Sequence, residues 1–249
     1  MIRHPRLLVA LAAMTLPVAA LAAPSYTAAV ADPARPADDT ARDADRKPAE
    51  MLAFAKVKPG QTIVDYMPGK GYFTRLFSAA VGPKGMVYAD VPQMMIDLFA
   101  KSGHAMPASV STEPGRGNVH DVVARNGSLN LPTKVDLIWT SQNYHDVHIF
   151  AGAAGAAQLD KAVFDSLKPG GLFVVLDHAA MPGLDDAGMK QLHRIDEALV
   201  KKEVLAAGFV LDGESKALAN PADPHSANVF DPSIRGHTDQ FILRFRKPG

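Results

Sequence analysis

Four histidines could approach one another in the folded chain, since two of them follow predicted strand ends. They are His145, His148, His178 and His193. Imidazole exchanges protons near neutral pH and is also a common metal ligand. The spacing His145-x-x-His148 is not a familiar zinc signature, and no acid-rich cluster completes it, so we expect no metal site. A hydrolase or metal-assisted enzyme that uses this histidine group stays open as an alternative.

A dense run of polar and aromatic side chains, residues 140–148, follows a strongly apolar strand pattern. It includes Asn143, Tyr144, His145 and Asp146. Strand ends in open α/β sheets face the crevice in which ligands bind. The run therefore marks a candidate site.

A second candidate is the loop at residues 64–74, which joins a predicted strand to a helix. Gly69 and Gly71 let the backbone approach a ligand closely, and the helix start offers free N–H donors. Asp90 ends the next strand, at the place where an acid accepts hydrogen bonds from a ribose diol. The alternatives are a tight strand-to-helix turn and an Asp90 that simply begins a turn before Pro92.

Strands and helices alternate along the rest of the chain. This alternation predicts an α/β fold with a Rossmann-like, doubly wound, mostly parallel seven-stranded sheet. The last two strands follow each other without a helix, which predicts a C-terminal antiparallel hairpin. We expect strands near residues 62–65, 86–89, 119–124, 135–139, 172–176, 209–211 and 241–245, and helices at 73–81, 94–101, 156–167 and 187–207.

At the glycine loop the sequence resembles the class I S-adenosylmethionine-dependent methyltransferases. Asp65, Gly69 and Gly71 match the acid and the alternating glycines of that family's first motif, and Met67 stands where its first glycine is usual. A narrower similarity, to an exported bacterial group of predicted methyltransferases, rests on four short runs at residues 143–146, 168–171, 193–196 and 206–209. The resemblance covers residues 47–248.

This resemblance implies S-adenosylmethionine as cofactor. It is not specific for the methyl acceptor, which is unknown and which we expect to be a small molecule. Asp90 would hold the ribose and Asn126 would contact adenine. Tyr144 and His145 would orient or deprotonate the acceptor, with Asp146 steadying the histidine. The full set of expected cofactor-binding residues is Asp65, Met67, Gly69, Gly71, Asp90, Asn126 and Asn143.

The first residues are typical of a secretory signal peptide. A short basic start precedes an apolar run at residues 7–21, and Ala20-Leu21-Ala22 gives the small-residue pattern of a cleavage site. We expect a signal peptide at residues 1–22, a flexible leader at 23–47 and one methyltransferase-like domain at 48–249. The product would be periplasmic or secreted, without stable membrane insertion after cleavage.

Composition narrows the partners. The chain has 26 basic and 26 acidic residues, and loss of Arg3 and Arg6 with the signal peptide leaves it slightly acidic. Nucleic-acid-binding proteins carry a basic excess, so we expect no nucleic acid partner. The absence of cysteine excludes disulfides and thiolate chemistry.

Export conflicts with the supply of the implied cofactor, which is made and used in the cytoplasm. Together with Met67 in the glycine loop, this conflict keeps a second hypothesis open. The fold would then serve as a non-catalytic module that binds a small ligand in the cell envelope.

Overall fold

The computed structural model describes residues 26–249, so the predicted signal peptide lies outside the described residues. Within this range the chain forms a seven-stranded sheet in the order β3-β2-β1-β4-β5-β7-β6. The first five strands are parallel, whereas β7 is antiparallel to both β5 and β6. The predicted fold class is therefore confirmed. The strands are β1 (Thr62–Tyr66), β2 (Met86–Asp90), β3 (Val119–Val122), β4 (Val135–Ser141), β5 (Leu167–His178), β6 (Val210–Ser215) and β7 (Gln240–Arg246).

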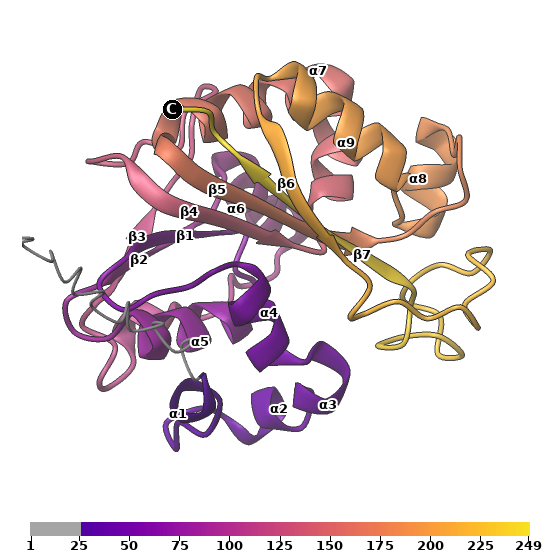
Figure 1. Ribbon diagram of the computed structural model, residues 1–249. Coiled ribbons are helices and arrows are strands. Elements are labelled where there is room, and N and C mark those ends of the chain that lie inside the picture. The colour runs from indigo at the N-terminus through magenta and orange to yellow at the C-terminus, as the bar shows by residue number, and fades with distance from the viewer. Residues whose placement is uncertain (1–25) are drawn as a thin grey trace, which may run out of the picture.

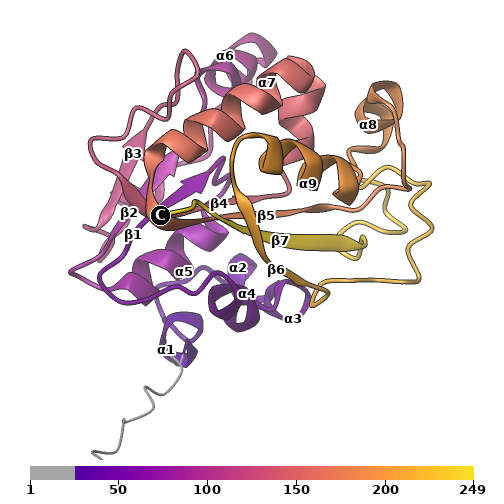
Figure 2. The same ribbon diagram turned by 45° about the horizontal axis from the view of Figure 1, so that its top comes forward.

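Helices cover both faces of this sheet (Figures 1 and 2). Successive residues of a strand point to opposite faces, so Ile63 enters one apolar core and Val64 the other. The first core includes α4 (Pro48–Phe54) and α5 (Tyr72–Val81), and the second includes α7 (Tyr144–Ser166), α8 (Asp186–Leu192) and α9 (Glu197–Ala206). Burial on both faces is the usual condition of a parallel sheet.

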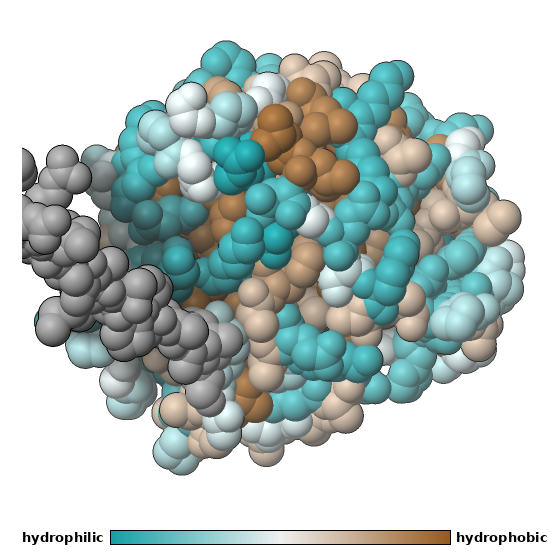
Figure 3. All heavy atoms as spheres, viewed as in Figure 1, coloured by the Kyte–Doolittle hydropathy of each residue, from teal (hydrophilic) through white to brown (hydrophobic). Residues whose placement is uncertain are grey.

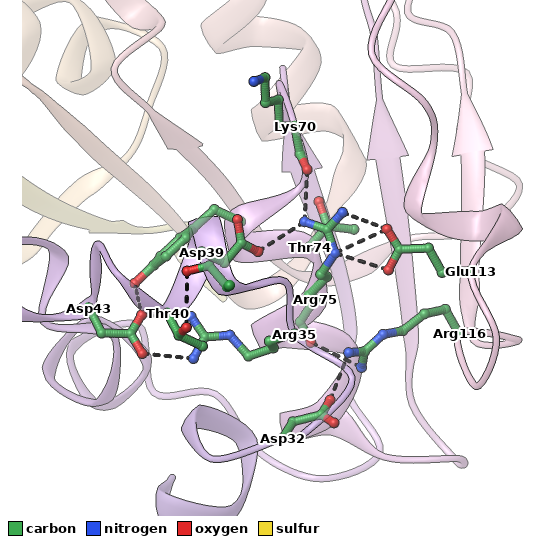
Figure 4. Close-up of polar contacts among 12 residues, drawn as sticks. Asp32, Arg35, Asp39, Thr40, Asp43, Lys70, Thr74, Arg75, Glu113 and Arg116 are labelled. Carbon is green, nitrogen blue, oxygen red and sulfur yellow. Dashed lines mark hydrogen bonds and ion pairs between the residues drawn. The ribbon is translucent and has the colours of Figure 1, made fainter.

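The N-terminal arm, residues 26–47, is ordered, so the predicted flexible leader is wrong in its described part. It forms three short helices, α1 (Thr27–Val30), α2 (Ala37–Thr40) and α3 (Asp43–Arg46). Some of its charged side chains form buried or partly buried ion pairs: Arg35 pairs with Asp43, and Asp39 pairs with Arg75 of α5 (Figure 4). The prediction of disorder rested on composition alone, which treats charged side chains as solvated and does not show which of them pair in the folded chain.

The helix predicted at residues 187–207 is two helices. His193 ends α8 in a left-handed conformation with φ of 53°. Ile195 then forms a bridge with Ala179, just beyond β5, and the side chain of Asp196 caps α9 by accepting from the Ala198 N–H. The break brings His193 toward the strand ends.

Helix α7 begins at Tyr144, earlier than the helix predicted at 156–167. The polar residues 144–148 therefore lie at the start of this helix. Gly152, with φ of 64° and ψ of −173°, kinks the helix after them. Helix α6 spans Gln93–Ser102. None of the helices in residues 26–249 combines the length and apolar composition that a membrane span requires.

The face seen in Figure 3 is mostly polar, with a compact apolar patch near α9 and β6. These elements carry three exposed large apolar side chains, Leu205, Val210 and Leu211. The patch lies away from the glycine loop.

Candidate active site

The glycine loop leaves β1 and enters α5 in the way the sequence predicted. Buried Asp65 accepts a hydrogen bond from Thr74 Oγ1 at 2.6 Å, and burial raises the pKa of this carboxyl to about 7. Gly69 and Gly71 have φ of 57° and 82°. A Cβ on Gly71 would lie 2.2 Å from Val110 Cγ2, so only glycine fits there.

Met67 also adopts a left-handed conformation, with φ of 56°. This costs a residue with a side chain roughly 1–2 kcal/mol. Two hydrogen bonds hold it: its N–H donates to Asp90 O at 2.8 Å, and its carbonyl accepts from Asn143 Nδ2 at 3.0 Å. Asn143 thus joins the predicted site by fixing the loop.

A cleft opens over the carboxyl ends of β1 and β2, and we call it the main cleft. Its apolar wall comes from α6 and from the segment before β3. Asn143 and Asp146 reach it from the start of α7. The lining residues include Met67, Gly69, Gly71, Ala89, Val91, Met95, Phe99, Met106, Pro107, Asp121, Asn143 and Asp146.

Asp90 ends β2, next to Ala89 of the cleft lining, and is fully buried. Its Oδ1 accepts from the Ala124 N–H at 2.9 Å, whereas Oδ2 has no hydrogen-bond partner within residues 26–249. Burial raises the pKa of Asp90 to about 8. Its neighbours Ala89 and Val91 line the cleft.

Asn126 is placed differently from the prediction. It sits in an exposed turn with φ of 53° and lines a separate pocket with Gln93 and Ala124. Asp121 of β3 is a cleft residue that the sequence did not predict. It lines the main cleft and accepts hydrogen bonds from Ser109 Oγ and Ser111 Oγ.

A second pocket lies on the other side of Met67, between the glycine loop and the N-terminal arm. It is lined by Arg42, Arg46, Asp65 and Ser141, among others. Arg46 donates to Ser141 Oγ at 2.9 Å, and burial lowers the pKa of its guanidinium to about 10. The two arginines were not predicted as site residues because they were assigned to the leader.

The side chain of His145 is held by Asp177, which the sequence analysis also missed. His145 Nδ1 lies 2.7 Å from Asp177 Oδ1, and the backbone N–H of His145 donates to Asp177 Oδ2 at 2.8 Å. Burial acts to lower the pKa of His145, but the charges of Asp177 and Asp146 outweigh it and raise the pKa above its ordinary value. Asp146 approaches the other ring nitrogen, with Oδ1 3.4 Å from Nε2.

Tyr144 does not face the cleft, so its predicted contact with an acceptor is wrong. It is fully buried, and its hydroxyl oxygen lies 2.9 Å from Asp160 Oδ2 and 3.2 Å from Glu203 Oε2. Burial and these two carboxyls raise the pKa of the phenol far above its ordinary value. Tyr144 was expected to lie in a loop at the cleft. It is instead the first residue of α7, and its side chain points into the core.

The fold brings three of the four predicted histidines together. The ring centre of His145 lies 5.6 Å from that of His193 and 5.8 Å from that of His178. His178 also bonds to Thr238 Oγ1 at 2.7 Å, whereas His148 points toward Glu203, with 2.8 Å between Nε2 and Oε2.

Comparison with known proteins finds methyltransferases of similar sequence. No family profile matches the chain. The chain is 31% identical over 196 residues to the ubiquinone/menaquinone biosynthesis C-methyltransferase of Vibrio cholerae, covering 75% of this chain and 62% of that protein. It is 31% identical over 127 residues to protein-L-isoaspartate O-methyltransferase 1 of Arabidopsis thaliana, covering 50% of this chain and 49% of that protein. The chain thus spans less than two thirds of the length of these relatives.

Solved structures agree on the fold. A S-adenosylmethionine-dependent methyltransferase from Aquifex aeolicus superimposes with a TM-score of 0.54 at 16% identity, covering 83% of this chain and 98% of that one. An arsenic(III) S-adenosylmethionine methyltransferase from Chlamydomonas reinhardtii gives 0.54 at 15% identity, with coverage of 91% and 74%. The chain is therefore similar in sequence to methyltransferases, and in fold to S-adenosylmethionine-dependent methyltransferases.

Proposed function

We propose that the protein transfers a methyl group from S-adenosylmethionine to a small-molecule acceptor. Two observations carry this proposal: a glycine loop that lines the main cleft, and a buried carboxyl oxygen of Asp90, at the end of the neighbouring strand β2, that has no hydrogen-bond partner within residues 26–249. A buried acceptor without a donor is costly, and a ribose hydroxyl would satisfy it.

The residues present fit the cofactor. S-adenosylmethionine supplies an activated methyl group on its sulfonium, so the protein has mainly to bind and orient. Gly69 and Gly71 allow a ligand to lie against the backbone, and the apolar wall formed by Met95 and Phe99 suits a flat heterocycle. The arginines of the second pocket would attract a carboxylate from the far side of Met67.

His145 is the residue we assign to the acceptor side. Asp177 fixes its ring through Nδ1, which leaves Nε2 directed toward Asp146 at the cleft wall. A ring held in this way can orient an acceptor and remove its proton. The ring of His145 is oriented mainly by Asp177, at 2.7 Å from Nδ1, and Asp146 contributes a longer contact of 3.4 Å to Nε2.

We also propose that the protein is exported and belongs to the narrower exported bacterial group. The basic start, the apolar run at residues 7–21 and the small residues at 20–22 support this. Fractionation of cells that express the full chain tests it. A processed protein in the periplasmic or culture fraction is expected, and an unprocessed cytoplasmic protein would contradict it.

Met67 favours a second candidate function, a non-catalytic module that binds a small ligand. Its side chain stands between the main cleft and the second pocket, where the family usually has glycine. A ligand smaller than the cofactor could occupy one side alone.

Titration calorimetry separates these functions. We expect both S-adenosylmethionine and S-adenosylhomocysteine to bind, and Asp90→Ala to weaken binding at least tenfold by removing the ribose acceptor. Absence of heat at millimolar ligand would rule out methyl transfer. Unchanged affinity in Asp90→Ala would remove Asp90 from the ribose role.

A further inference from the structure

We propose that His145, Asp146 and His193 form a binding site for one divalent transition-metal ion at the edge of the main cleft. The sequence predicted no metal because His145-x-x-His148 lacked an acid to complete it. The fold replaces His148 with His193 from another element and adds Asp146. One ligand atom from each of the three residues lies within 4.8 Å of the other two.

The distances match metal coordination. Asp146 Oδ1 lies 3.4 Å from His145 Nε2 and 3.6 Å from His193 Nδ1. Nitrogen and oxygen ligands at about 2.1 Å from a tetrahedral zinc ion are about 3.4 Å apart. The three atoms are too far apart for strong direct hydrogen bonds and at the spacing that a shared ion would impose.

Asp177 prepares His145 for this role. With Nδ1–H donating to Asp177 Oδ1 at 2.7 Å, the neutral ring carries its lone pair on Nε2, toward Asp146. A carboxylate that orients a metal-binding imidazole through its other nitrogen is the usual outer support of such sites. Asp177 is fully buried and also accepts the His178 N–H, so it is firmly fixed.

The backbone of His193 is held in place by its two following residues. Arg194, fully buried, pairs with Asp223 through both terminal nitrogens, at 2.8 and 3.1 Å. Ile195 bridges to Ala179 beyond β5. His193 itself keeps a left-handed backbone with φ of 53°, a conformation that histidine adopts at some cost.

The ligand set selects the kind of metal. Two imidazoles and one carboxylate suit zinc, iron(II) or cobalt(II) better than magnesium or calcium, which prefer oxygen ligands alone. Three protein ligands leave at least one coordination position open. Because Asp146 lines the main cleft, this position would accept an oxygen of the methyl acceptor, an inference that rests on the proposed function. Nε2 of His145 would then be a ligand and not a base.

Metal binding is tested directly on the full-length protein, purified without a histidine tag. After treatment with a chelator and dialysis, we expect zinc to bind with a stoichiometry of one by calorimetry and elemental analysis. Cobalt(II) should give the visible absorption bands of a tetrahedral or five-coordinate site. Neither readout requires S-adenosylmethionine, so failure of methyl transfer would leave the metal result standing.

Two variants and a control locate the site. Asp146→Asn and His193→Gly should each weaken zinc binding at least 100-fold, and glycine suits the backbone of residue 193. His237→Ala removes an exposed histidine elsewhere and should bind like the parent. Thermal unfolding confirms that each variant folds. Absence of zinc binding, or full binding by both folded variants, would overturn the site and leave these three side chains as an acid–base cluster only.

Discussion

Met67 is the residue at which this chain departs from the family motif. It pays the cost of a left-handed backbone and separates two pockets that one extended ligand would need to share. Since its N–H and carbonyl are both bonded, the backbone of the loop should survive loss of the side chain.

We therefore expect Met67→Gly to bind S-adenosylhomocysteine about tenfold more tightly and to be more stable by up to roughly 1 kcal/mol. Calorimetry and urea unfolding measure the two effects. Lys56→Gly is the matched control, because Lys56 has φ of 55° but lies outside both pockets. Equal affinity in Met67→Gly and the parent would show that the side chain does not obstruct the ligand.

Asp90 gives a prediction that depends on pH. Its pKa in the folded protein is about 8, raised by burial above the ordinary value for aspartate. The folded state therefore holds the proton more tightly than the unfolded state, and stability is lost as the pH rises toward 8. Asp90→Asn keeps an acceptor for the Ala124 N–H and carries no charge at any pH.

The expected result is that Asp90→Asn becomes more stable relative to the parent as the pH rises from 5 to 8.5, by about 4 kcal/mol. Urea unfolding at each pH measures the difference. Asp38→Asn, at an exposed position of α2, should follow the parent throughout. A difference that does not change with pH would mean that Asp90 is ionised in the folded protein.

At the scale of elements, a few buried or partly buried charged side chains attach the N-terminal arm to the domain. Arg35 is fully buried in its side chain and donates to both oxygens of Asp43, at 2.8 and 2.6 Å, while the Tyr72 hydroxyl donates to Asp43 Oδ1 at 2.7 Å. These contacts join α3 to the start of α5, directly beside the glycine loop (Figure 4).

Asp43→Ala should destabilise the protein by about 3 kcal/mol, because it leaves Arg35 buried without its carboxylate. Chemical unfolding measures the loss, and Asp38→Ala is the control on the neighbouring helix. If Asp43→Ala does not change the free energy of unfolding, the arm contributes little to the stability of the domain.

The elements show what sequence patterns can and cannot predict. The sequence patterns that end at Asp65 and Asp90 were sufficient to predict these two strands and the polar residues at their ends. The reason is that buried parallel strands are apolar, whereas their carboxyl ends carry polar site residues. Tyr144 was misplaced because short-range pattern did not show that α7 starts there. Asp177 could be found only from the fold, since it acts on His145 across 32 residues of sequence. His193 was among the histidines that the sequence singled out, but its place beside His145 and Asp146 comes from the fold.

At the scale of the whole molecule, the sheet brings the separate parts of the site to one edge. The carboxyl ends of β1 and β2 form the floor of the main cleft, and those of β4 and β5 carry the start of α7 and Asp177. The arm closes the side beyond Met67 with Arg42 and Arg46. A cofactor that spans both pockets would therefore stabilise the domain and the arm together.

Limited digestion with trypsin tests this coupling, since Arg42 and Arg46 are cleavage sites within the arm. Ligand at 100 times its dissociation constant stabilises the folded state by about 2.7 kcal/mol. We expect saturating S-adenosylhomocysteine to slow cleavage in the arm by a similar factor, about 100-fold, if the arm must open to be cut. Cleavage at Lys216, whose side chain is 70% exposed and outside both pockets, should keep its rate. A raised melting temperature with unchanged cleavage in the arm would instead confine the ligand to the main cleft, with Met67 as its boundary.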